Sequence, residues 1–150
     1  LKLWYQFFLS SPYGDMCSYK LRNTTIIECT HANYTNPCVD TAQLPYAGIH
    51  PVVFLSHNLH RIEHVHFKDV RKEVFRKYNS LSDSFLKTIL SGIFTVPGDG
   101  CIDFSSIIKI LQQNQYNGWI IVEAEQDPDK ADPLHYAISA RNYYDSIIIN

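Results

Sequence analysis

The sequence has few cysteines, and none of them belongs to a CxxC pair. The four cysteines are Cys17, Cys29, Cys38 and Cys101, and no histidine stands near them at the spacing of a zinc finger. This pattern excludes a zinc finger and gives no disulfide framework. We therefore expect reduced thiols and a cytoplasmic protein, with Cys38 and Cys101 as small core residues.

An excess of positive charge and long apolar runs are also lacking. The formal net charge is −2, so we expect no nucleic-acid partner. No apolar run reaches the roughly 20 residues of a membrane-spanning helix, so we expect no membrane partner. The 150 residues, 45% of them hydrophobic, suit one globular domain. The chain does not begin with methionine, which leads us to expect a fragment or a partial reading frame.

Residues 61–71 carry more chemistry than any comparable window, with two histidines among basic and acidic side chains. β-forming residues predict a short strand over residues 61–67. Side chains alternate along a strand, so His64 and His66 should share one face with Ile62. A neutral imidazole is a common metal ligand, which makes this face a candidate metal site. The alternative is a half-exposed edge strand whose histidines only meet water.

The hydrophobic pattern alternates between strands and helices. Apolar runs predict strands at residues 1–9, 38–41, 61–67 and 119–123. Apolar residues at helical spacing predict helices at residues 50–60, 81–90, 103–113 and 132–148. Such an alternation is typical of an α/β fold with a parallel sheet and right-handed crossovers.

Local signals refine these predicted elements. Ser82 or Asp83 is expected to cap the helix near residues 81–90, and Asp103 and Asp132 are expected to cap the two helices that follow. Residues 10–36 are rich in turn-forming side chains, with one short strand expected at residues 25–29.

Three residues of metal-binding type stand at the ends of successive predicted strands, namely Asp40, His66 and Glu123. Chemistry in a parallel α/β fold collects beyond the C-terminal strand ends, so these side chains should meet. Two carboxylates and an imidazole suit a divalent ion such as Mn²⁺ or Co²⁺, which would act as a Lewis acid on a carbonyl. Glu125 should share a strand face with Glu123 and either position substrate or remain a solvated loop carboxylate.

Five motifs resemble the inosose dehydratase family, within the xylose isomerase-like barrels. They are residues 39–48 (VDTAQLPYAG), 64–71 (HVHFKDVR), 92–100 (GIFTVPGDG), 118–128 (GWIIVEAEQDP) and 133–137 (PLHYA) with Ala140 and Arg141. The resemblance covers about residues 37–147, and residues 1–36 match poorly. It implies a half TIM barrel, the C-terminal part of a xylose isomerase-like barrel, as a single domain over residues 1–150.

The resemblance also implies a function. The family is a cytosolic lyase of inositol breakdown that removes water from 2-keto-myo-inositol with Mn²⁺ or Co²⁺ as cofactor. Asp40, His66 and Glu123 would be the metal ligands, and His66 and Glu123 the catalytic residues. Lys68 and Arg71 would meet substrate oxygens, beside a rim formed by the loop at residues 97–100. We add Gln43, His64 and Glu125 to the predicted substrate contacts.

Two departures from the family pattern stand out. The family usually reads Asp-Thr-Gly-His where this chain has Asp40-Thr41-Ala42-Gln43, and glutamine cannot shuttle a proton near neutral pH. A full eight-stranded barrel takes roughly 250 residues, and a half barrel leaves strand edges unpaired. We therefore expect either a homo-oligomer or a missing N-terminal half.

Two alternative functions remain open from the sequence. A metal-dependent sugar isomerase or epimerase on the same barrel would share the metal site. A non-catalytic remnant, acting as a binding or oligomerising module, would explain Gln43 and the missing half.

Overall fold

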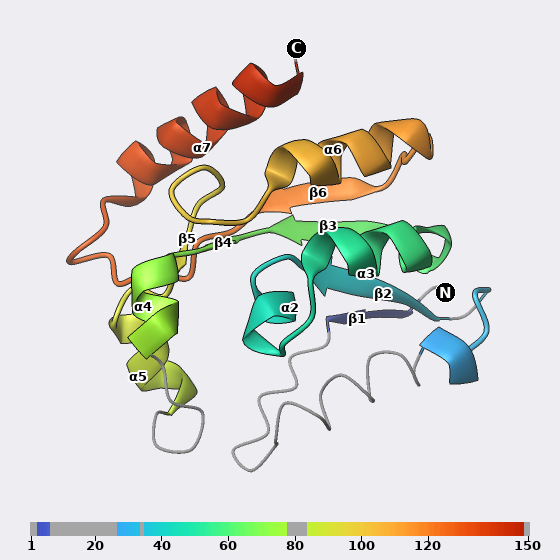
Figure 1. Cartoon of the computed structure of the whole chain (residues 1–150), viewed down its shortest axis with the longest axis horizontal. Coiled ribbons are helices and arrows are strands. Elements are labelled where there is room, and N and C mark those ends of the chain that lie inside the picture. The colour runs from blue at the N-terminus through green and yellow to red at the C-terminus, as the bar shows by residue number, and fades with distance from the viewer. Residues whose placement is uncertain (1–2, 7–26, 34, 78–83, 149–150) are drawn as a thin grey trace.

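The computed structural model describes residues 3–6, 27–33, 35–77 and 84–148. Its centre is a parallel sheet of four strands, in the order β1-β2-β3-β6 (Figure 1). These strands are β1 (Leu3–Gln6), β2 (Thr35–Asp40), β3 (His64–Phe67) and β6 (Trp119–Val122). A separate antiparallel pair joins β4 (Asp69–Val70) to β5 (Phe94–Thr95).

Helices separate the strands along the chain. They are α2 (Gln43–Tyr46), α3 (Pro51–Asn58), the 3₁₀ turn η1 (Leu59–Arg61), α4 (Lys72–Lys77), α5 (Phe85–Leu90), α6 (Phe104–Gln113) and α7 (Pro133–Ile148). The predicted α/β class, with parallel strands alternating with helices in a partial, open sheet, is confirmed. Within the described ranges, no helix combines the length and apolarity needed to cross a membrane.

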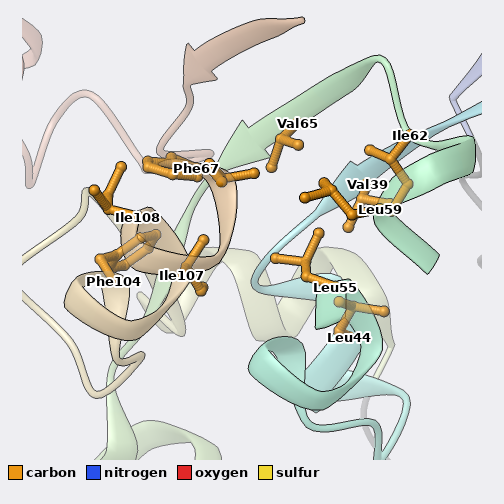
Figure 2. Close-up of a cluster of buried hydrophobic side chains, with 11 residues drawn as sticks. Val39, Leu44, Leu55, Leu59, Ile62, Val65, Phe67, Phe104, Ile107 and Ile108 are labelled. Atoms are coloured by element: carbon orange, nitrogen blue, oxygen red, sulfur yellow. The ribbon is translucent and has the colours of Figure 1, made fainter. Parts of the chain in front are cut away.

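One face of the sheet packs against the hydrophobic core. Apolar side chains of β2 and β3 pack there against α3 and α6, which lie along the same side of the sheet (Figures 1 and 2). The buried cluster consists of Val39, Leu44, Leu55, Leu59, Ile62, Val65, Phe67, Phe104, Ile107, Ile108 and Leu111. Each such side chain contributes roughly 1.5–3 kcal/mol when fully buried, so this packing fixes which way each strand faces.

Side chains alternate between the two faces along β3, so its polar side chains lie on the face opposite the core. Val65 and Phe67 are fully buried in the core, while His64 and His66 are only half-buried. The two imidazole rings lie 5.2 Å apart, centre to centre, which confirms that they share a face. In the parallel register Cys38 stands opposite His64, and Asp40 stands opposite His66.

The strand that carries the histidines is shorter than predicted. Arg61 lies in η1, and the turn closes where the amide of Ile62 donates to the carbonyl of Leu59 at 3.0 Å. Ile62 therefore joins the core beside Val65, and the prediction that it shares the histidine face is wrong. The 3₁₀ turn directly before Ile62 interrupts the predicted strand, so the face alternation applies only within β3, which begins at His64.

The bounds and caps of other elements also differ from the predictions. Of the strand expected at residues 25–29, the described residues 27–29 are helical. Helix α5 is capped by Ser84, whose hydroxyl accepts from the amide of Lys87 at 3.2 Å, whereas Ser82 and Asp83 lie outside the described residues. The short elements α2, α4, β4 and β5 have too few residues to give a periodic signal.

Two predicted helix caps are confirmed. Asp103 accepts from the amide of Ser106 at 3.0 Å and begins α6, whose buried residues fall at helical spacing. Asp132 accepts from the amide of His135 at 2.7 Å at the start of α7. The core placement expected for Cys101 is wrong because its side chain is exposed, and Cys38 is only partly buried.

A buried aspartate organises the loop beyond β5. The carboxylate of Asp69 accepts backbone N–H groups from Val70, Gly98, Cys101 and Ile102, at 2.8–3.1 Å. Burial raises the pKa of Asp69, and these four hydrogen bonds lower it again only in part. A side chain on Gly100 would overlap this carboxylate and lie 2.6 Å from the carbonyl of Val70, so the loop needs glycine there. Asp69 therefore shapes the backbone around the predicted rim.

We expect Asp69→Ala to lower the free energy of unfolding by about 3 kcal/mol, because four buried or part-buried amides lose their acceptor. Urea unfolding followed by circular dichroism measures this change. The matched control is Glu73→Ala on the exposed surface of α4, whose pair with Arg76 should contribute less than about 0.5 kcal/mol. Equal unfolding midpoints for the two variants would contradict a structural role for Asp69.

Candidate metal and active site

The structure brings together the three residues predicted as metal ligands. Asp40 ends β2, His66 is the penultimate residue of β3, and Glu123 directly follows β6. One ligand atom from each of the three lies within 4.8 Å of those of the other two. These side chains come from three neighbouring strands of one parallel sheet, so the topology of the sheet creates the cluster.

A short hydrogen bond joins His66 to Glu123. Nδ1 of His66 lies 2.6 Å from Oε2 of Glu123, and the two side chains are 14% and 27% exposed. A carboxylate on one ring nitrogen selects the tautomer of an imidazole and leaves the other nitrogen for a second partner. The pair is therefore oriented for proton transfer or for metal binding.

Lys68 is the cation at the centre of the cluster, and its side chain is fully buried. Its ammonium lies 2.9 Å from Oδ2 of Asp40 and 3.0 Å from Oε1 of Glu123, and it also bonds Glu125. Burial alone lowers the pKa of Lys68, but the charge of Asp40 and the bonds to Glu125 and Asp40 outweigh this effect. The pKa is therefore raised, and Lys68 carries its charge at neutral pH.

The charges in this cluster do not balance. Three carboxylates, those of Asp40, Glu123 and Glu125, surround the single ammonium of Lys68. Three carboxylates against one ammonium leave an excess of two acidic groups. A divalent cation carries the charge that would cancel this excess, and carboxylate and imidazole are donors that suit Mn²⁺ or Co²⁺.

Backbone contacts hold Asp40 and Lys68 in place. Oδ1 of Asp40 accepts the amides of Ala42 and Gln43, at 2.9 and 3.1 Å, which turns its other oxygen toward Lys68. The hydroxyl of Thr41 donates to the carbonyl of Lys68 at 2.6 Å and accepts from its amide at 3.0 Å. Sequence reasoning gave Thr41 no role, because its hydrogen bonds reach Lys68, which lies 27 residues further along the chain.

Glu123 and Glu125 both contact Lys68, but not because they lie on one face of a strand, as predicted. Strand β6 ends at Val122, so the two glutamates do not share a strand face. Glu125 instead has a φ angle of 46°, a conformation that is uncommon for residues other than glycine. This left-handed turn returns its carboxylate to Lys68. Backbone strain of this kind is concentrated at functional sites.

Two predicted substrate contacts lie beside the cluster. Gln43 follows Asp40 closely, and its Nε2 is a buried donor with no hydrogen-bond partner among the described residues. His64 lies two residues before His66 on the same face. Burial, and then the neighbouring His66, lower the pKa of His64, so its imidazole is neutral at pH 7. Their roles toward substrate stay predictions.

Cys38 is a site residue that the sequence analysis missed. It is opposite His64 in the register, and ligand atoms of Cys38, His64 and His66 lie within 4.8 Å of one another. Burial first, and then the charges of Asp40 and Glu123, raise the pKa of Cys38 to about 12. The sequence did contain a signal for this placement: Cys38 stands two residues before Asp40, so both side chains lie on one face of the strand.

Arg71 lies at the rim rather than in the cluster. Its guanidinium donates to Asp99 at 2.8 Å, to Thr95 at 3.0 Å and to the hydroxyl of Tyr136 at 3.1 Å. It also donates to the carbonyl of Gly92 at 2.9 Å. These bonds link the loop after β5 to the start of α7, so Arg71 supports the rim, and its contact with substrate stays a prediction.

Comparison with known proteins identifies what this geometry resembles. The sequence model of the xylose isomerase-like TIM barrel family matches residues 25–145. An inosose dehydratase from Clostridium botulinum is 49% identical over 118 residues, covering 79% of this chain and 40% of the relative. An inosose dehydratase from Clostridium beijerinckii is 53% identical over 104 residues, covering 69% of this chain and 35% of the relative.

A solved structure supports the same fold. The probable 3-DHS dehydratase from Bacillus anthracis superposes with a TM-score of 0.57 at 13% identity, covering 86% of this chain and 43% of its own. At this identity the likeness shows the fold alone. The chain spans only about 40% of the length of the curated relatives it matches.

We expect Lys68→Met to lower the free energy of unfolding by about 3 kcal/mol, because three carboxylates then face one another without a buried cation. Added Mn²⁺ should restore part of the loss by replacing the missing positive charge. Thermal or urea unfolding with and without the ion measures both effects. Lys130→Met is the control, since the side chain of Lys130 is 66% exposed and water screens its pair with Asp127. An equal loss in both variants would contradict the central role of Lys68.

Proposed function

The chain belongs to the xylose isomerase-like TIM barrel family, and on this premise we propose that it is the metal- and substrate-binding part of an inosose dehydratase. The reaction is the removal of water from 2-keto-myo-inositol. The observation that carries the proposal is the convergence of Asp40, His66 and Glu123 at three parallel strand ends. The relatives that are 49% and 53% identical are both inosose dehydratases, which favours this lyase over a sugar isomerase or epimerase.

The residues present fit a divalent ion. Ligand atoms bound at about 2.0–2.2 Å from an ion lie at most roughly 4.4 Å apart, so donors within 4.8 Å of one another are near binding range. The ion would share or replace the contacts that these carboxylates now make with Lys68 and His66. We propose Mn²⁺ or Co²⁺, held by Asp40, His66 and Glu123. When bound, such an ion polarises the ketone and makes the proton on the adjacent carbon more acidic.

The proposed reaction removes a proton from the carbon beside the ketone and a hydroxyl from the next carbon. Together they leave as water, and the remaining enol rearranges to a dione. We assign the proton transfers to Glu123 and His66, which lie 2.6 Å apart. Glu123 has two carboxylate oxygens, one for the ion and one for the proton, and the hydrogen bond from His66 would help to hold that carboxylate in place.

Lys68 and Gln43 complete the proposed substrate site. The charged ammonium of Lys68 is positioned to stabilise negative charge on substrate oxygens, since a buried cation acts strongly where water is excluded. Gln43 offers its buried Nε2 donor to a substrate hydroxyl. Glu125, which already bonds Lys68, accepts from a second hydroxyl, and His64, beside His66 on the same face, is a further proposed substrate contact.

The open edge of the sheet suggests a structural partner. In the described sheet β6 pairs only with β3, and its Trp119, Ile121 and Val122 are 68%, 39% and 43% exposed. We propose that further parallel strands, from another segment of the protein or from a second copy, cover this edge. The described cysteines Cys29, Cys38 and Cys101 are free thiols, which supports a cytoplasmic location in this proposal.

The proposed activity is tested with the purified chain, Mn²⁺ and 2-keto-myo-inositol, by following dione formation. We expect turnover, and we expect Glu123→Gln to reduce it by at least about 100-fold, because the variant loses the proton acceptor. Glu73→Gln, on the exposed side of α4, is the control and should keep the rate. Faster turnover of a ketohexose would favour the isomerase alternative, and a chain that binds the ion without turnover would be a non-catalytic module.

Metal binding is tested separately by thermal unfolding. Mn²⁺ at 100 times its dissociation constant should stabilise the folded chain by about 2.7 kcal/mol, because the ion binds the folded state alone. Asp40→Asn should abolish this shift by removing one negative ligand. If Mn²⁺ does not change the melting temperature of the unmodified chain, the proposed metal site is wrong, whatever the outcome with substrate.

A further inference from the structure

Cys38, His64 and His66 form a second set of ligand atoms on the same sheet face. The three donors lie within 4.8 Å of one another, and all three side chains are partly exposed, so an ion could reach them. Cys38 and His64 are directly opposite on β2 and β3, two residues before the pair of Asp40 and His66. This row is therefore one step further from the strand ends than the carboxylates.

The two sets differ in chemical character. Asp40 and Glu123 offer hard oxygen donors, whereas Cys38 and His64 offer a sulfur and a nitrogen. Thiolate and imidazole favour zinc and other thiophilic ions, while carboxylates favour manganese. His66 belongs to both sets, so the two sets share one imidazole.

We propose that Cys38, His64 and His66 form a thiophilic metal site that takes Zn²⁺ and overlaps the carboxylate site at His66. Three protein ligands and one open position are a normal arrangement for zinc. Donors around a tetrahedral zinc ion lie roughly 3.4–3.6 Å apart, so donors within 4.8 Å of one another need to approach by at most about 1.4 Å. Binding releases one proton, because the thiol of Cys38 becomes a thiolate when its sulfur bonds the ion.

This site has a consequence for the carboxylate site. Zinc on Cys38, His64 and His66 engages an imidazole that the carboxylate set also needs as a ligand. Zinc therefore competes with Mn²⁺ through this shared donor. The existence of the thiophilic site is independent of the proposed dehydratase activity, and only the resulting inhibition rests on that activity.

The experiment uses Co²⁺ as a spectroscopic probe for Zn²⁺. A cobalt ion bound to a thiolate gives a charge-transfer band in the near ultraviolet, and we expect this band in the unmodified chain. Cys38→Ser should abolish it and weaken Zn²⁺ binding by about 100-fold, measured by competition with a chromophoric chelator. Asp40→Asn should keep both the band and the zinc affinity while weakening Mn²⁺ binding.

Matched controls separate Cys38 from the other thiols. Cys29→Ser and Cys101→Ser alter exposed cysteines outside the cluster and should leave the band unchanged. His64→Gln is a second test that keeps every thiol, and it should weaken Zn²⁺ binding with Mn²⁺ binding unchanged. A band that persists in Cys38→Ser, or zinc affinity that Asp40→Asn reduces as much as Cys38→Ser does, would overturn the proposal. A Cys38-dependent band in a chain without dehydratase turnover would support this site and reject only the proposed function.

Discussion

One buried ammonium holds the polar end of this sheet together. Lys68 reaches carboxylates from β2 and from the segment after β6, which otherwise would repel one another in a partly dry site. Its charge is tolerated in the interior because three anions surround it and the ring of Phe94 lies 5.2 Å away. The side chains of Asp40, Glu123 and Glu125 are therefore positioned by the same group that neutralises part of their charge.

This arrangement depends on the register of β3 between its two neighbours. Val65 and Phe67 are fully buried in the core, and because side chains alternate along a strand, His64 and His66 lie on the other face. A shift of the strand by one residue would exchange the two faces and place phenylalanine among the carboxylates. The hydrophobic core thus specifies which face of β3 carries the site. Thr41 reinforces the register through its two hydrogen bonds to the backbone of Lys68.

Sequence reasoning succeeded where a signal is local or repeats with a fixed period. The parallel α/β class, the cap of α6 at Asp103 and the meeting of three strand ends all follow from periodicity and topology. It failed where a single turn interrupts the period, as at η1, which moved Ile62 into the core. It also missed contacts between distant segments, because nothing near Asp69 indicates that its carboxylate accepts amides about 30 residues further on.

The position of Gln43 adds a further constraint on His66. Where the resembling family has a histidine, this chain has an amide that cannot carry a proton, so the imidazoles left beside Asp40 are His64 and His66. Of these, His66 alone contacts Glu123 through a hydrogen bond in the described structure. The same ring is also the one member common to the carboxylate and thiol ligand sets. The proposed hard-ion and soft-ion sites therefore depend on the same imidazole, so under these proposals the ion that binds His66 decides which of the two sites is complete.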